Sequence, residues 1–407
     1  MRRGLLPIGA LTFTAVGIGG LSNVLFNVAA ASVLAPSAFG ALLAIFTIYS
    51  LLTLALSGIE SASARAASPS NETAGAAEVL HNEETGGSGD WWWHTVKVSA
   101  LLGLILSPFL FPLAYFFTIP LWQMGAVILV LPAAAGVFSS FGYLVGKGRI
   151  VMMQSLSICA ALSKSVLTIG AWLLSASQAL FVFVGLTPIV LQFVASRWIT
   201  RSDSLTQRDF KGARVWMNSA ILAVFFAGQN VDIWLLRLMS ALELSGVYGA
   251  ATSFARALPI IAALWGLYLI PRMARADDQA ARVLTLKVVA FSIVSSTVIA
   301  LIAAAVGSWA IEFMFDEEYR GALELLPWIL VATVPWCGAA SLVHAFMAQT
   351  HRAWVLLLVF GVFASQTLCI WLAGPISSRL IVIYGVSGVT LLILLILGQR
   401  RRTRSSP

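Results

Sequence analysis

The chain has 407 residues, of which 59% are hydrophobic and 10% are charged, and its formal net charge is +8. Soluble domains carry about 25% charged residues, so this composition excludes an ordinary soluble protein. Apolar runs of about 20 residues, rather than short alternating segments, favour membrane-spanning helices over a β-barrel.

In chain order, windows of about 20 apolar residues predict about twelve spanning helices. The first set covers residues 5–34, 39–63, 96–117, 121–144, 150–174 and 179–198. The second set covers residues 215–238, 244–270, 283–305, 325–348, 353–373 and 380–397. The pattern predicts an N-terminal lobe at 1–200, a basic linker at 201–214, and a C-terminal lobe with a basic tail at 215–407.

The only long predicted loop, residues 65–93, is rich in Gly, Ser, Asn and Glu, so we expect it to be flexible. It ends at Trp91, Trp92 and Trp93, which we expect to mark the membrane interface.

The basic residues predict which loops face the cytoplasm. With the N-terminus inside, 20 of the 25 Lys and Arg residues lie in cytoplasmic segments. Only Arg237, Arg320 and Arg379 lie in segments assigned to the outside. Because excess Lys and Arg marks cytoplasmic loops, we expect a multi-pass plasma-membrane protein with both termini in the cytoplasm. This topology accounts for the positive charge without a nucleic-acid partner.

The two sets of spans are predicted to form a parallel internal repeat. Gly40 lies 25 residues before Arg65, and Gly246 lies 26 residues before Arg272. The first helical hairpin is therefore similar to the hairpin of the seventh and eighth spans, with Asn27 and Asp232 in related places. The general similarity of all tight helical hairpins is an alternative explanation.

Three segments resemble the polysaccharide flippases of the multidrug/oligosaccharidyl-lipid/polysaccharide exporter superfamily. Residues 31–65 contain the turn into Phe39-Gly40, and residues 230–275 contain Asp232, Gly246-Val247-Tyr248 and Pro271. Residues 313–336 carry Phe315, Tyr319, Ala322 and Leu326. The resemblance implies two six-helix lobes forming a V around a central cavity. It also implies alternating access, by which a lipid-linked saccharide moves from the inner to the outer leaflet. Loop 65–93 departs from the family pattern.

Two basic residues lie deep inside predicted spans, where ionisable side chains are costly and usually face a cavity or a partner. Lys164 shares a helix face with Ser157 and Thr168, which suits a cavity lining; snorkelling to the headgroups is the alternative. Arg256 shares a face with Thr252 and Ser253. A guanidinium can hold a phosphate through two parallel hydrogen bonds, although an ion pair with Asp232 would explain Arg256 equally well.

Amide and interfacial residues complete the candidate substrate site. Asn23 and Asn27 are four residues apart and share one helix face, and Asn230 lies in the seventh span. Hydrogen bonding between helices is the alternative role for these amides. Arg65 is a candidate contact for an incoming diphosphate, or an interfacial arginine that sets topology. Asp232 is a candidate proton or cation site.

These residues favour a flippase for a polyprenyl-diphosphate-linked saccharide used in cell-surface polysaccharide assembly, with Lys164 and Arg256 giving the cavity a positive field. Glycosyltransferases or a polymerase of the same pathway are the expected partners besides the bilayer. An ion-coupled drug exporter of the same superfamily is the alternative.

An enzyme is disfavoured because the four histidines are scattered and the acidic outside residues at 312–324 are expected to form a solvated turn. We expect no cofactor, no metal and no nucleic acid.

Overall fold

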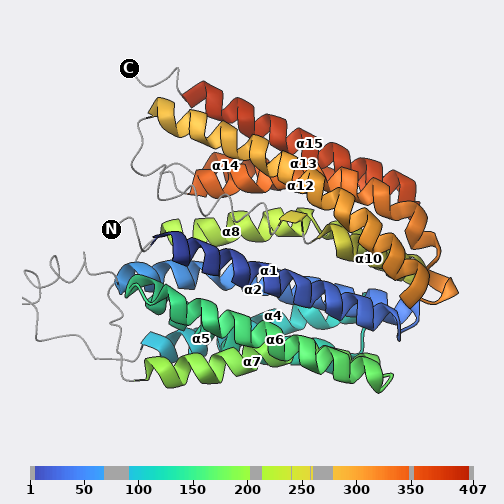
Figure 1. The fold of residues 1–407 in the computed structure, drawn as a ribbon, viewed down its shortest axis with the longest axis horizontal. Helices are drawn as coiled ribbons and strands as arrows, with labels where there is room; N and C mark the ends of the chain where they lie inside the picture. Colours follow the sequence, from blue (N-terminus) through green and yellow to red (C-terminus); the bar gives the residue numbers. More distant parts are fainter. Residues whose placement is uncertain are drawn as a thin grey trace, which may run out of the picture. The chain divides into compact units, whose positions relative to one another are not determined.

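The computed structural model describes residues 5–67, 91–201, 213–239, 241–256, 258–259, 278–347 and 353–402, and every regular element in these ranges is helical (Figure 1). The first helices are α1 (Leu5–Ala31), α2 (Pro36–Ala66), α4 (Trp91–Phe116), α5 (Leu121–Gly146), α6 (Ile150–Leu173) and α7 (Gln178–Thr200). The others are α8 (Ala213–Gly228), α9 (Val231–Leu238), α10 (Leu242–Ala255), α12 (Asp278–Met314), the 3-10 turn η3 (Glu317–Tyr319), α13 (Gly321–Met347), α14 (Ala353–Ala373) and α15 (Ser377–Arg402).

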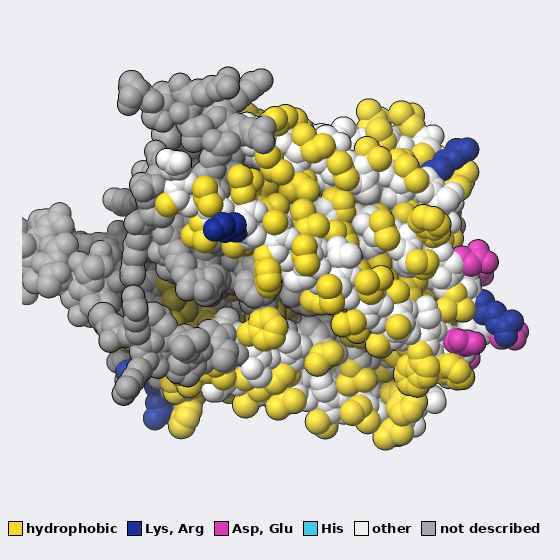
Figure 2. All heavy atoms as spheres, turned by 45° about the horizontal axis from the view of Figure 1, so that its top comes forward, with side chains coloured by type: hydrophobic (Ala, Val, Ile, Leu, Met, Phe, Trp, Pro, Cys, Tyr) yellow, Lys and Arg dark blue, Asp and Glu magenta, His cyan; other side chains and the backbone are white. Residues whose placement is uncertain are grey.

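The helices confirm the predicted all-α membrane class. In the described ranges, ten helices are long and apolar enough to cross a membrane, or eleven if the bent pair α8–α9 is one span. Figure 2 shows hydrophobic side chains over most of the described surface, as expected where lipid is the solvent. Residues 257 and 260–270 of the predicted eighth span lie outside the described residues, as do most of loop 65–93 and most of linker 201–214.

One predicted span is wrong in detail, because the seventh is broken rather than continuous. Helices α8 and α9 meet at an angle of 55°. The break follows Gly228, a poor helix former, and the Asn230 side chain donates to the Phe226 carbonyl oxygen at 2.7 Å. Gln366 Nε2 donates to the Gly228 carbonyl oxygen at 3.0 Å, which satisfies one acceptor that the break frees. Side-chain amides thus hydrogen-bond the backbone at the break, in a segment that hydropathy predicts to be one continuous span.

The chain forms two compact units. The first contains residues 1–22, 48–171 and 179–219, and the second contains residues 23–47, 172–178 and 220–407. The α1–α2 hairpin, residues 23–47, therefore belongs to the second unit, together with the C-terminal helices. The division into lobes at linker 201–214 stays a prediction.

In the first unit, α4 packs along α5, and two glycines of α5 allow α2 to approach closely. A Cβ on Gly142 would collide with the Glu60 carbonyl oxygen, and one on Gly146 would lie 2.7 Å from Ala67 Cβ. Small residues four apart are a common device for close helix packing in membranes, where dispersion replaces the hydrophobic effect.

The tryptophans at the start of α4 differ in burial. Trp93 is 49% exposed, but Trp92 is only 6% exposed. Trp92 Nε1 donates to the Gly136 carbonyl oxygen and to Ser140 Oγ, both at 3.1 Å, and the Arg197 guanidinium lies 4.7 Å from its ring centroid. Trp92 therefore joins α4, α5 and α7 as a core residue.

Gly142→Ala is expected to lower the melting temperature of the purified protein by several degrees, because the new methyl group would push α2 from α5. The matched control is Gly170→Ala, since a Cβ on Gly170 meets no atom within 4 Å. There the better helix propensity of alanine should leave stability equal or slightly raised. Equal melting temperatures for the two variants would contradict this packing.

In the second unit, α13 is the central helix and packs against α10, α12 and α15. Most residues of the segment Glu317–Phe346 are buried, and its Trp336 stacks on Tyr384 of α15 with ring centroids 5.3 Å apart. Before this helix, the acidic residues at 312–324 are exposed, and Arg320 and Glu317 form a surface ion pair at 2.9 Å. A short turn, η3, is therefore present where a turn was predicted, and its acidic residues are exposed.

Candidate functional site

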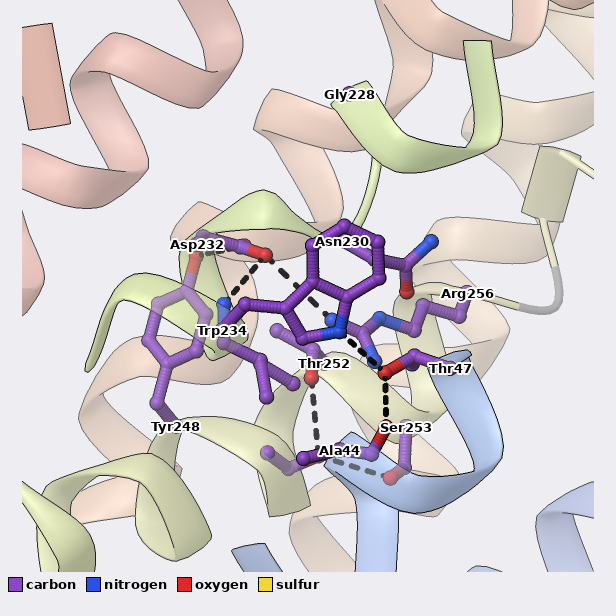
Figure 3. A network of polar contacts seen from close by, with 12 residues as sticks. Ala44, Thr47, Gly228, Asn230, Asp232, Trp234, Tyr248, Thr252, Ser253 and Arg256 are labelled. Carbon is purple, nitrogen blue, oxygen red and sulfur yellow. Dashed lines mark hydrogen bonds and ion pairs between the residues drawn. The ribbon is translucent and has the colours of Figure 1, made fainter. Parts of the chain in front are cut away.

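A buried polar cluster lies in the second unit, where α9 begins and α10 ends (Figure 3). Asp232 occupies the first turn of α9, where the helix dipole favours a carboxylate. Its Oδ1 accepts the Ile233 N–H at 2.9 Å, and its Oδ2 accepts the Tyr248 hydroxyl at 2.7 Å. With 2% of its side chain exposed, Asp232 is fixed by bonds from its own helix and from α10.

Arg256 follows the last residue of α10, where the helix dipole favours a cation. Its Nη2 lies 3.6 Å from Asp232 Oδ1, and 22% of its side chain is exposed. That distance is too long for a hydrogen bond, and Nη2 has no hydrogen-bond partner among the described residues. The guanidinium is thus held by charge, and a donor remains to bind an acceptor.

Amide side chains with unused hydrogen-bonding atoms lie at the break before α9. Among the described residues, three of these buried atoms have no hydrogen-bond partner: Gln229 Nε2, Asn230 Oδ1 and Gln366 Oε1. Trp234 Nε1 donates to Thr47 Oγ1 of α2 at 2.7 Å. Figure 3 shows Asn230, Trp234 and Arg256 gathered near Asp232 and Thr47. The cluster offers a cation, amide donors and acceptors, and an aromatic surface, which is chemistry for binding a polar ligand.

The structure brings together three of the predicted site residues, Asn230, Asp232 and Arg256. The ion pair that was left open for Arg256 is formed. The role of Arg256 in binding a substrate stays a prediction, as does the role of Asp232 as an ion site.

The other predicted site residues lie elsewhere. Lys164 is half-buried on α6 in the first unit; one turn earlier, the Ala161 carbonyl oxygen accepts the Ser22 hydroxyl of α1 at 2.9 Å. Its face of α6 is therefore turned toward α1. On α1, Asn23 is exposed and Asn27 is half-buried. Arg65 lies in the last turn of α2, and its side chain is outside the described residues.

Sequence analysis missed two residues near this region. Gln366 is the single amide in a mostly apolar predicted span, and its position deep in that span is the sequence feature that could have identified it. Arg237, counted among the residues assigned to the outside, is only 1% exposed, and sequence analysis did not predict this burial. Hydropathy places Arg237 at the end of a span and gives no sign of what covers it.

The described residues thus form a helical membrane protein with a buried polar cluster. No model of a protein family matches the chain, and no curated protein sequence does. Solved structures share its fold. One is an inward-facing multidrug resistance MATE family transporter of the MOP superfamily, with 12% identity, a TM-score of 0.69 and 96% of each chain covered.

Two other structures extend the comparison. An outward-facing MATE transporter of the same superfamily matches with 13% identity and a TM-score of 0.65, covering 98% of this chain and 96% of its own. A MOP superfamily transporter from Pyrococcus furiosus matches with 13% identity and a TM-score of 0.57, covering 98% and 95%. The chain therefore shares the fold of these transporters over nearly its whole length. This likeness confirms the predicted all-helical membrane fold.

Proposed function

We propose that the protein is a flippase that moves a polyprenyl-diphosphate-linked saccharide from the inner to the outer leaflet of the plasma membrane by alternating access. The observation that carries the proposal is the Arg256 guanidinium, which is partly exposed and has an unused Nη2 donor. A diphosphate offers the acceptor oxygens that a guanidinium binds best.

The surroundings of Arg256 support an anionic, hydroxyl-rich cargo. Both carboxylate oxygens of Asp232 already accept hydrogen bonds, from Ile233 and Tyr248. The charged atom of the ion pair that has no hydrogen bond is therefore Nη2 of Arg256. The unused amide atoms of Asn230 and Gln366 match sugar hydroxyls, which both donate and accept. Lys164 is proposed to add positive charge from the first unit, and Asn23, Asn27 and Arg65 are proposed to contact the cargo along its path.

The fold supports the mechanism without choosing the cargo. Structures of this fold are described in inward-facing and outward-facing conformations, which are the two states that alternating access requires. The transporter from Pyrococcus furiosus is described as having a binding pocket of reverse polarity that suggests a different function. Pocket charge is thus a better guide to cargo than the fold.

An ion-coupled exporter of small molecules is the second candidate. It is favoured by Asp232, a carboxylate buried to 2% exposure, which could exchange a proton or cation. In that case the buried acid would drive transport, and the cargo would be an organic cation, as for an exporter of drugs. The Arg256 cation beside the acid, with its unused Nη2 donor, is the observation against it.

Purified protein in proteoliposomes tests the proposal. A fluorescent polyprenyl-diphosphate oligosaccharide should be translocated, whereas an organic cation with an imposed proton or sodium gradient should not be. The double variant Lys164→Ala/Arg256→Ala should abolish translocation at normal membrane levels. Full transport by the double variant, or transport of the organic cation alone, would refute the flippase assignment.

A further inference from the structure

Aromatic and basic side chains gather where α4 begins and α7 ends, at one end of the first unit. The ring of Trp92 packs against Phe193 of α7 with centroids 5.0 Å apart, and it meets the ring of Trp93 edge-to-face at 4.9 Å. The Arg197 guanidinium lies 4.7 Å from the centroid of Trp92. These contacts fix the two helix ends against each other and leave Trp93, which is 49% exposed, at the surface.

A second pair of a cation and an aromatic ring follows at the end of α7. Arg201, four residues after Arg197, is exposed, and its guanidinium lies 5.7 Å from the ring centroid of Trp198. A ring below a guanidinium steadies its plane, while the N–H donors along the edge of the plane point elsewhere. In the part of the chain that the structure describes, the Arg201 side chain forms no hydrogen bond and no ion pair. Its donors are therefore placed to bind an anion.

The turn between α5 and α6 brings two more bases to this end of the unit. Lys147 and Arg149 lie in this turn, and both are exposed. Leu144 before the turn and Met153 after it pack in one apolar cluster with Ile199 of α7. The turn is thus held beside the last residues of α7, and its positive charge adds to theirs.

The described part of the first unit offers little negative charge to neutralise these bases. Its single acidic residue is Glu60, which is partly buried in α2. Lys97 adds another exposed base, one turn from Trp93 on the same face of α4. Because helical side chains lean toward the start of their helix, Lys97 adds its charge at the same end.

We propose that this end of the first unit binds the headgroup of an anionic phospholipid of the inner leaflet. The headgroup site consists of Trp93 and Lys97 on α4, Arg197, Trp198 and Arg201 at the end of α7, and the basic turn between α5 and α6. The loop charges predict that this end faces the cytoplasm, where the leaflet carries anionic lipids. Basic pockets between spanning helices on that side are suited to such headgroups, and arginine binds a phosphate through two parallel hydrogen bonds.

The surface around the headgroup site favours a lipid over a soluble phosphate. Trp198 is 67% exposed and lies among the bases, as expected for a ring at the level of the headgroups. One turn deeper on α7, Val194 is 61% exposed, and Leu101 of α4 is 57% exposed. A soluble anion would leave these apolar side chains unused, whereas the acyl chains of a lipid would cover them. The inference does not depend on the proposed cargo.

Native mass spectrometry of the purified full-length protein in detergent tests the headgroup site. Dioleoyl phosphatidylglycerol should bind roughly tenfold more tightly than dioleoyl phosphatidylcholine, which has the same acyl chains but no net charge. Arg201→Gln should weaken binding of phosphatidylglycerol about fivefold, since it removes one base near the membrane surface. Trp198→Leu keeps an apolar side chain but removes the ring below the guanidinium, so it should weaken binding about twofold. Both residues are exposed, so both variants should fold.

Lys287→Gln is the matched control, because Lys287 is an exposed base of α12 on the same predicted side of the membrane. It has no ring partner among the described residues, and its loss should leave the affinity unchanged. Equal affinity for the two lipids, or equal losses in Arg201→Gln and Lys287→Gln, would overturn the inference. Displacement of phosphatidylglycerol by equimolar inorganic phosphate or farnesyl diphosphate would also overturn it, because the site would then select a free phosphate or the diphosphate of a cargo. Selective binding in a protein that translocates no saccharide would support the headgroup site and remove only the proposed cargo.

Discussion

Replacing Arg256 with alanine is expected to slow translocation of a polyprenyl-diphosphate saccharide by about ten- to a hundredfold. Hydrogen bonds to charged groups contribute about 1.5–3 kcal/mol, and about 1.4 kcal/mol corresponds to a tenfold change. The Nη2 donor has no other hydrogen-bond partner among the described residues, so the alanine variant is expected to lose a hydrogen bond to the cargo. Initial rates in proteoliposomes, normalised to the amount of inserted protein, measure the effect.

Two companion variants separate charge from geometry. Arg256→Lys keeps the charge but not the planar pair of donors, so its rate should lie between those of wild type and Arg256→Ala. Arg379→Ala is the matched control, because Arg379 is exposed and donates to the nearby Ala373 carbonyl oxygen. It should transport at the wild-type rate. If Arg256→Ala and Arg379→Ala are equally active, Arg256 is a structural ion-pair partner and the anionic cargo loses its main support.

Hydropathy predicted most of the fold because few backbone conformations are stable in lipid. A spanning segment must satisfy every N–H and C=O internally, so an apolar run of sufficient length becomes a helix. The same physics identified Asp232 and Arg256, since ionisable groups at depth need partners. Sequence reasoning therefore found both members of the ion pair and left open whether they bind each other or a ligand.

Hydropathy cannot distinguish the interior of a membrane protein from its lipid surface, because both are apolar. Leu129 and Leu131 lie two residues apart on α5, yet they are 79% and 4% exposed. For the same reason, hydropathy gave no sign that Trp92 and Arg237 are buried. Their burial depends on residues distant in sequence, such as Phe193 for Trp92 and Ser37 for Arg237. The break at Gln229 and Asn230 likewise depends on Gln366, far along the chain.

Removing the Asp232 carboxylate is expected to have the largest effect on stability. Asp232→Ala would leave the buried Tyr248 hydroxyl without its acceptor and the Arg256 guanidinium without a counter-charge. Breaking one side of such a pair costs about 3 kcal/mol. Unfolding of the purified variant in detergent should show this loss, and Tyr248→Phe, which keeps the charge pair, should lose much less. An Asp232→Ala protein as stable as wild type would show that the pair is not a structural element of this unit.

Asp232→Asn then separates the two candidate functions. The amide still accepts one hydrogen bond, so the fold should persist, but Arg256 no longer shares its charge with a carboxylate. A flippase for an anionic lipid should then bind its cargo more tightly and release it more slowly, so the apparent affinity rises while the maximal rate falls. An ion-coupled exporter should instead lose its response to the ion gradient, since the exchangeable acid has gone. Because the two outcomes change different quantities, one variant measured for affinity, rate and gradient dependence distinguishes an anion carrier from an ion-driven exporter.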